Sequence, residues 1–425
     1  MASFPKQFQY YLSRLNNVRR NTVRISPITS TSANPNDIIV VRLPSNSLVN
    51  LQSFNWVFEA TTTSTATYFT QLPRDIESII DRMVVLVNGL QVYSGSFQQY
   101  NVLWNILLRA TAGKDYQLVR GLLQNSLDQT TPTANASSQL FCINDWLGFF
   151  NAQPYILDTS VLGDIEIQIT LAPVGVLSID NASNVAPSYS LANMFFTIDT
   201  VSFLDPLYDE MMSAKLGSGE VLEIPYQNCF AFQNTTNTSQ RFALNSQCVN
   251  MLLAVNRASS YATNAVVSNA GTSAYFAFTN GGAGTAANST LEYQWQVDNV
   301  YMPSVPINTR DDKPLNYQFV KQAFNDTNNV LGFDNLVQSY ANRYGQPITL
   351  ANLRIAQAQF NHIMALNLNV SNGDDRLLSG YNSAGSNAQF FLNLTAAPSS
   401  HITTIFAICS SVLRVSAGRL LEVVV

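Results

Sequence analysis

Charged side chains are scarce in this chain of 425 residues, since Asp, Glu, Lys and Arg together make up only 12% of it. Soluble domains usually carry about 25% charged residues. Apolar residues make up 46% and the formal net charge is -5, whereas a disordered chain has low apolar content and high net charge. The composition therefore predicts a folded protein with a surface rich in Asn, Gln, Ser and Thr.

Long apolar runs are also missing. The most apolar stretches, such as Met83–Val87, have the length of a strand and polar flanks, whereas a membrane-spanning helix needs about 20 consecutive apolar residues. The start of the chain has no apolar segment before its positive charges. We therefore expect no secretory signal and synthesis in the cytosol.

Histidine and cysteine, the commonest catalytic and metal-binding residues, are rare. His362 and His401 are the only histidines, and both stand in alternating strand patterns, which indicates structural or surface roles. The four cysteines contain no CxxC pair, so we expect buried thiols rather than a zinc site or a disulfide framework. They are Cys142, Cys229, Cys248 and Cys409.

The carboxylates do not form a recognisable site either. Asp311–Asp312 and Asp374–Asp375 are adjacent pairs, whereas a glycosidase needs two carboxylates that face each other across a cleft. The segment 372–375 lacks the spaced acidic residues of a calcium loop. The chain also lacks the motifs of hydrolases, nucleotide-binding proteins and zinc peptidases. We predict no enzyme, no metal, no cofactor and no small-molecule substrate.

The main pattern in the sequence is the alternation of apolar and polar residues. It is clearest over Asp164–Leu171, where every second residue is aliphatic, as in a half-buried strand. The same pattern predicts strands over 37–43, 53–60, 78–93, 195–203, 221–232, 241–255, 291–302, 354–370, 389–394, 402–415 and 419–425. Apolar spacing of three to four residues predicts helices over Phe97–Arg109, Asp205–Leu216 and Phe333–Tyr344.

Two halves of similar outline are separated by Gly217-Ser218-Gly219. Each half has enough strands to close its apolar faces only by stacking as a sandwich or curling as a barrel, and a jelly roll is the most economical choice. We predict an all-β protein of two tandem eight-stranded jelly-roll sandwiches, a double jelly roll, with a few short connecting helices. The predicted divisions are a basic arm over 1–36, a first jelly roll over 37–216 and a second over 217–425. The uncharged excursion Ala258–Thr290 is expected to be an outward loop.

The N-terminal arm is the one charge cluster. It carries five positive charges and no acidic residue before Asp37, at Lys6, Arg14, Arg19, Arg20 and Arg24. Such an arm can meet nucleic acid phosphates or lipid head groups. It can equally be a peripheral segment whose charges pair with its own domain, and the sequence leaves both interpretations open.

Three segments carry a resemblance to a known family. The first comprises Leu72–Gly89 and Tyr100–Leu103, the second runs from Phe203 through Leu216 to Val221–Tyr226, and the third is Leu413–Val423. They resemble the first jelly roll, the bridge between jelly rolls and the last strands of double jelly-roll major capsid proteins of polinton-like viruses, adintoviruses and virophages, which are dsDNA viruses. The three segments together touch both halves of the chain.

This resemblance implies a structural virion protein. It implies a homotrimer that forms a pseudo-hexameric capsomer, contacts neighbouring trimers, and meets penton and minor capsid proteins in an icosahedral shell. The basic arm would then lie beneath the shell, in contact with the genome or an internal membrane. Low charge with many amide and hydroxyl side chains suits broad neutral contacts between copies.

The alternative is a carbohydrate-binding or carbohydrate-active β-sandwich protein. Four tryptophans and 18 tyrosines could supply platforms on which sugars stack. However, Trp56, Trp104, Trp146 and Trp295 stand within apolar patterns rather than polar loops, which favours core packing.

Overall fold

In a computed structural model of the chain, no helix has the length and apolar character needed to cross a membrane among the described residues. The described residues are 18–62, 70–73, 75–93, 97–111, 139–152, 154–179, 188–203, 207–234, 238–259, 261, 274–280, 291–309, 312–324, 362–369, 379–385, 389–396, 401–416 and 420–425.

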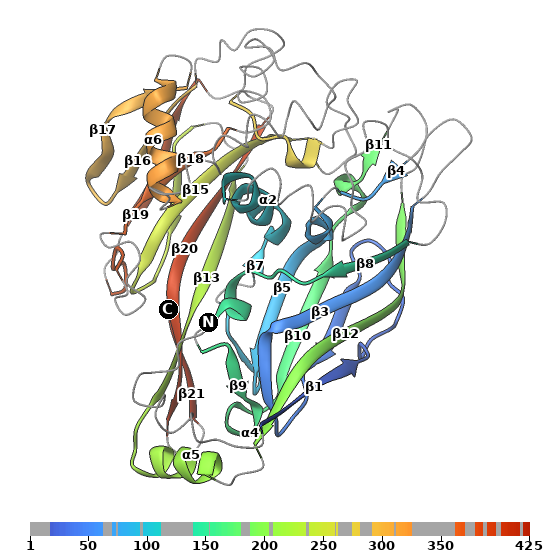
Figure 1. Cartoon of the computed structure of the whole chain (residues 1–425). Helices are drawn as coiled ribbons and strands as arrows, with labels where there is room; N and C mark the ends of the chain where they lie inside the picture. Colours follow the sequence, from blue (N-terminus) through green and yellow to red (C-terminus); the bar gives the residue numbers. More distant parts are fainter. Residues whose placement is uncertain are drawn as a thin grey trace.

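The first half of the chain forms two antiparallel sheets that enclose a core (Figure 1). One sheet has the order β1-β12-β3-β8, with β9 also paired to β3. Its strands are β1 Val18–Ile25, β12 Tyr189–Phe203, β3 Leu48–Thr62, β8 Gln139–Ile143 and β9 Ile156–Asp158. The other has the order β2-β10-β5-β6, with β7 paired to β5. Its strands are β2 Ile38–Arg42, β10 Ile165–Leu171, β5 Ile80–Val87, β6 Leu90–Gln91 and β7 Phe97–Gln98. A short pair, β4 Thr70–Gln71 and β11 Ser178–Ile179, lies beside them.

The second half repeats this plan. Its larger sheet has the order β13-β20-β15-β18, with β21 paired to β20, and its smaller sheet has the order β14-β19-β16-β17. The larger sheet contains β13 Leu222–Asn234, β20 His401–Ser416, β15 Val249–Ala258, β18 Met364–Asn367 and β21 Leu420–Val424. The smaller contains β14 Gln240–Ala243, β19 Gln389–Thr395, β16 Glu292–Val297 and β17 Val300–Asn308.

In β10 the alternation of apolar and polar residues in the sequence appears as alternating buried and partly exposed side chains. Ile165, Ile167, Ile169 and Leu171 are buried, whereas the residues between them are partly exposed. A strand of one sheet in a sandwich has one face toward the core and one toward solvent, so the period of two seen in the sequence is the signature of this position.

Strand β20 departs from that rule because it is buried on both faces. Phe406 and Ile408 contribute to the apolar cluster that contains the core of the first jelly roll. Ile405 and Ala407, between them along the strand, contribute to the cluster between the two sheets of the second. The larger sheet of the second jelly roll is therefore packed between its own partner sheet and the first jelly roll.

Short helices connect the strands. The α-helices are α2 Tyr100–Thr111, α4 Thr159–Leu162, α5 Leu207–Gly217 and α6 Lys313–Ala323, and the 3-10 helices are η1 Ile76–Ile79, η2 Gly148–Asn151, η3 Val174–Val176 and η5 Ala274–Phe276. The helices expected over Phe97–Arg109 and Asp205–Leu216 correspond to α2 and α5, but the predicted start at Phe97 is wrong, because Phe97–Gln98 is strand β7 and α2 begins at Tyr100. The one expected over Phe333–Tyr344 lies outside the described residues.

Several sequence-based expectations need correction. The sequence predicts one strand over each of the segments 78–93 and 291–302, but each contains two antiparallel strands joined by a turn, β5 and β6 in the first and β16 and β17 in the second. The segment 241–255 is not one strand but two, β14 and β15, which belong to different sheets. The excursion Ala258–Thr290 is not wholly an outward loop, because Tyr275 and Phe278 within it are buried. The segment has no charged residue, but these two aromatic side chains are apolar and pack inside the protein. The tip at 281–284 lies outside the described residues.

The halves meet at α5, which follows β12 and precedes β13 at the lower end of the molecule in Figure 1. The expected boundary between residues 216 and 217 falls at the C-terminal end of this helix. Strand β1 lies within the stretch 1–36 that the sequence analysis assigned to the basic arm.

Candidate functional surfaces

Three of the five basic arm residues lie on β1, the edge strand of the first sheet, and the other two lie outside the described residues. Arg19, Arg20 and Arg24 belong to β1, which pairs antiparallel with β12 along its whole length. Lys6 and Arg14 precede the described part of the chain. The structure therefore brings three arginines onto one strand of the first jelly roll.

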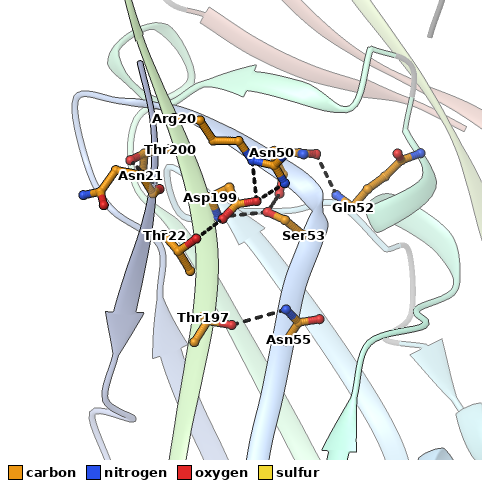
Figure 2. A network of polar contacts seen from close by, with 10 residues as sticks. All are labelled: Arg20, Asn21, Thr22, Asn50, Gln52, Ser53, Asn55, Thr197, Asp199 and Thr200. Atoms are coloured by element: carbon orange, nitrogen blue, oxygen red, sulfur yellow. Dashed lines mark hydrogen bonds and ion pairs between the residues drawn. The ribbon is translucent and has the colours of Figure 1, made fainter. Parts of the chain in front are cut away.

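A buried carboxylate on β12 anchors this strand (Figure 2). The Arg20 guanidinium donates two hydrogen bonds to Oδ2 of Asp199, through Nε at 2.8 Å and through Nη2. The Thr22 hydroxyl donates to Oδ1 of the same side chain. The Asp199 backbone N–H donates to Oγ of Ser53 on β3, at 2.8 Å. Asp199 on β12 thus connects this strand to β1 on one side and to β3 on the other.

The carboxyl group of Asp199 stays ionised because its partners outweigh its burial. Burial alone would raise its pKa, but the hydrogen bonds from Thr22 and Arg20 and the Arg20 charge hold the pKa below the ordinary value of 3.8. A carboxylate with a lowered pKa in the folded state stabilises that state above the ordinary pKa. The stabilisation is lost as the pH falls through the folded-state value.

Replacement of this carboxylate by an amide is expected to loosen β1. Asp199→Asn keeps the shape of the side chain but removes the charge that attracts Arg20. Because the Arg20 side chain is 67% exposed, we expect a local loss of only about 1 kcal/mol. Hydrogen exchange of the β1 amides should become about fivefold faster, measured by mass spectrometry at neutral pH.

A second ion pair provides the matched control. Arg42 on β2 donates to Glu166 on β10 at 2.9 Å, in the other sheet of the same jelly roll. Glu166→Gln removes a comparable exposed pair and should leave exchange in β1 unchanged. Unaltered exchange in β1 after Asp199→Asn would show that main-chain pairing alone holds the strand.

The remaining two arginines of β1 have different environments. The Arg24 guanidinium lies 4.0 Å from the centre of the Phe195 ring on β12, a cation–π contact that holds the side chain along its own sheet. Arg19 is exposed and forms no ion pair among the residues that the structure describes. Among the described residues of its own jelly roll, the Arg19 charge is therefore uncompensated.

The seam between the two jelly rolls is lined by aromatic side chains. Tyr226 on β13 contacts the Tyr93 and Phe149 rings of the first half edge to face, with ring centres 6.4 and 5.5 Å apart. Its hydroxyl donates to the carbonyl of Val92 at 2.7 Å. The Tyr93 hydroxyl accepts from the backbone N–H of Phe149 at 2.6 Å. These contacts join the second jelly roll to the η2 region of the first.

A buried arginine also makes contacts across this seam. Arg257 on β15 is fully buried, and its Nη2 donates to Gln99 of the first half at 2.7 Å and to Thr404 of β20 at 3.0 Å. Its guanidinium lies 4.0 Å from the centre of the Tyr261 ring. The Tyr275 hydroxyl donates to Asp81 of β5 at 3.1 Å. Both polar and aromatic contacts therefore hold the jelly rolls in one arrangement.

His362 is poorly placed for acid-base catalysis. His362 is buried, and neither of its ring nitrogens has a hydrogen-bond partner among the described residues. Burial lowers its pKa to about 4. Burial also lowers the pKa of His401, at the start of β20. A catalytic base needs both access to substrate and a pKa near the working pH, and His362 has neither.

The other candidate groups have structural positions. The four cysteines are free thiols, and burial raises the pKa of each of them, which suppresses the reactive thiolate. Asp312 accepts from the backbone N–H of Asn308 just before α6, while Asp311 and the pair 374–375 lie outside the described residues. Within the described ranges, no three His, Cys, Asp or Glu side chains gather as a metal site would require.

The tryptophans expected in the core are buried there. Trp56, Trp104, Trp146 and Trp295 are each less than a tenth exposed. A sugar-binding platform must present the face of an aromatic ring to solvent, so none of the four can serve as one in this conformation.

Comparison with solved structures identifies the fold. The chain is similar to the VP54 protein of PBCV-1, as fitted into a cryo-EM reconstruction of the virophage Sputnik, with a TM-score of 0.59 and 12% identity over 96% of this chain and 97% of that one. It is similar to the Faustovirus major capsid protein, with a TM-score of 0.53 and 9% identity over 95% and 91% of the two chains. For the mavirus major capsid protein the TM-score is 0.50 and the identity 11%, over 95% and 89%.

These similarities run through both halves of the chain, which therefore has the double jelly-roll fold. By sequence, no protein-family model and no curated protein matches it. At identities of 9 to 12%, the similarity lies in the arrangement of the strands and not in the sequence.

Several residues of these surfaces could not be found from the sequence. Asp199 follows the buried Ile198 where β12 shifts register against β3, so alternation fails there. Nothing in the sequence marks Tyr226 or Arg257 as a contact between halves. The start of α6 does have a signal, because Asp312 precedes Lys313-Pro314, and Pro in the first turn after a capping residue is typical of a helix start.

Proposed function

We propose that the chain is the major capsid protein of an icosahedral virus, a structural protein of the virion rather than an enzyme. The observation that carries this proposal is the similarity to major capsid proteins over 95 to 96% of the chain. The described surfaces support it, because the histidines, cysteines and tryptophans lie where they stabilise the fold instead of forming a reactive or sugar-binding site.

The shared packing of the two jelly rolls suits this role. A shell subunit must present a fixed outline to its neighbours, and an interface between domains that is large and apolar suppresses relative motion. Here β20 packs with one face against the first jelly roll and with the other against the smaller sheet of its own jelly roll, and Tyr226 and Arg257 tie the halves together. Two similar sandwiches in a fixed arrangement make one third of a hexagonal tile, so three copies in a ring complete it.

We infer from this geometry that the protein forms a homotrimer, which then contacts neighbouring trimers and the penton and minor proteins of the shell. A closed ring of three needs a head-to-tail interface between two different patches of the same subunit. Lys6 and Arg14 are assigned to the interior of the shell, where they would face genome phosphates or lipid head groups. Arg20 and Arg24 already contact Asp199 and Phe195.

The expected mass in solution tests this assignment. Light scattering at several protein concentrations should give about 140 kDa, three times the chain mass of 46.8 kDa. A concentration-independent mass of one chain would refute the capsid proposal and would favour a monomeric binding module.

A further inference from the structure

Strands β1 and β21, like the other edge strands of the four sheets, each pair with only one described neighbour. Strand β1 pairs with β12, and β21 pairs with β20. No other described strand pairs with either of them. An open strand edge presents unpaired N–H and C=O groups, which is the usual basis for pairing with another chain.

Both strands also expose aliphatic side chains at their ends. Val18 at the start of β1 is 50% exposed, and Leu420 at the start of β21 is 70% exposed. Val221, just before β13 and close to the lower end of the same sheet, is also exposed. Exposed aliphatic residues beside an open edge favour association, because pairing there would also bury apolar surface.

The two edges carry opposite charge. Strand β1 contains three arginines and no acidic residue, and Arg19 forms no ion pair within the described part of the chain. On the other edge, Glu223, Arg414 and Glu422 are in register across β13, β20 and β21. Arg414 donates to Glu223 at 2.9 Å, so this row of three residues has one negative charge in excess, on the β21 side.

The charges on the β1 and β21 edges have opposite signs, which differs from the charge pattern that keeps edge strands from aggregating. Edge strands that must stay single are often guarded by charges of one sign, which repel a second copy. Here the charge on one edge attracts the charge on the other. Like edges of two copies would repel, whereas β1 of one copy and β21 of the next would attract.

The positions of the strands suit a ring. Figure 1 shows β21 at the lower left of the molecule and β1 at the lower right, at similar height. A head-to-tail contact that closes after a few steps joins two different patches on opposite flanks of the subunit, at the same level along the ring axis. In the view of Figure 1 the two edges lie apart and at similar height, which is compatible with such a contact.

We propose that β1 of one subunit pairs with β21 of the next subunit, with Arg19 of the first facing Glu422 of the second. This inference rests on the proposed function, because it assigns the contact that closes the trimer. The partner is a second copy of this chain, recognised by main-chain pairing, by the exposed aliphatic residues and by the ion pair.

Exchange of the two charges tests the contact. Arg19→Glu and Glu422→Arg each place like charges across the interface, and each should raise the dissociation constant of the trimer by about tenfold or more. The double variant restores opposite signs and should recover most of the wild-type affinity. Arg241→Glu, a reversal at an exposed position on β14, is the matched control and should leave the trimer unchanged. Circular dichroism confirms that each variant is folded.

A crosslink provides a readout that does not depend on affinity. Arg19→Cys and Glu422→Cys proteins, mixed and oxidised, should give disulfide-linked dimers on a denaturing gel, whereas neither protein alone should do so.

The outcomes separate the two proposals. A wild-type protein that is monomeric contradicts the proposed function itself. A wild-type trimer that is indifferent to both reversals, or whose weakened single variants are not restored by the double variant, leaves the capsid role intact and refutes the pairing of β1 with β21.

Discussion

Replacement of Tyr226 by alanine is expected to lower the free energy of unfolding by about 3 to 5 kcal/mol. The side chain is 5% exposed and contacts Tyr93 and Phe149 across the seam between the jelly rolls. Truncation leaves a cavity in a region where both halves are packed. The hydroxyl also donates to the carbonyl of Val92, and this hydrogen bond is lost as well. Urea unfolding, followed by tryptophan fluorescence, measures the change.

The conservative variant separates the ring from the hydroxyl. Tyr226→Phe keeps the aromatic contacts and removes only the hydrogen bond, so we expect a loss of about 1 to 2 kcal/mol. If Tyr226→Ala cost no more than Tyr226→Phe, the aromatic seam would contribute little, and the rigid arrangement of the two jelly rolls would need another explanation.

Acid should destabilise the protein through His362. The ordinary histidine pKa of 6.5 falls to about 4 in the folded state because the ring is buried. A group whose pKa is lowered by folding stabilises the folded state fully above the ordinary value, and this stability is lost as the pH falls toward the folded-state value. Between pH 6.5 and 4 the expected loss is about 3 kcal/mol, measurable by urea unfolding at a series of pH values.

Removal of the titrating ring should flatten this dependence. His362→Phe and His362→Gln, one apolar and one polar, should both be less sensitive to pH than the wild type across the same window. His401→Gln is the matched control and should retain most of the dependence, because His401 is only partly buried. An unchanged slope in both His362 variants would mean that carboxylates dominate the acid response of the protein.

The parts of the fold that the sequence could predict are those in which one face is apolar. Strand β10 and helix α2 have such faces, and all four tryptophans are buried, three of them on β3, α2 and β16. Periodicity reports a local preference for burial. It finds a strand or helix wherever that preference is regular.

The parts that it could not predict depend on contacts between distant segments. Strand β1 falls in the predicted arm because the chain carries five positive charges before its first acidic residue, and three of them lie on this strand. Its place in the sheet depends on pairing with β12, nearly 180 residues away, and on Asp199 there. The segment 241–255 was read as one strand because alternation does not reveal where a chain crosses from one sheet to the other.

Negative-stain electron microscopy of the purified protein is the most direct test of the central claim that this double jelly roll is a capsid subunit. Class averages should show particles with three-fold symmetry and a pseudo-hexagonal outline, because each of three subunits contributes two sandwiches of similar size. Single-chain particles, or assemblies with two-fold symmetry and no six-lobed view, would contradict the claim.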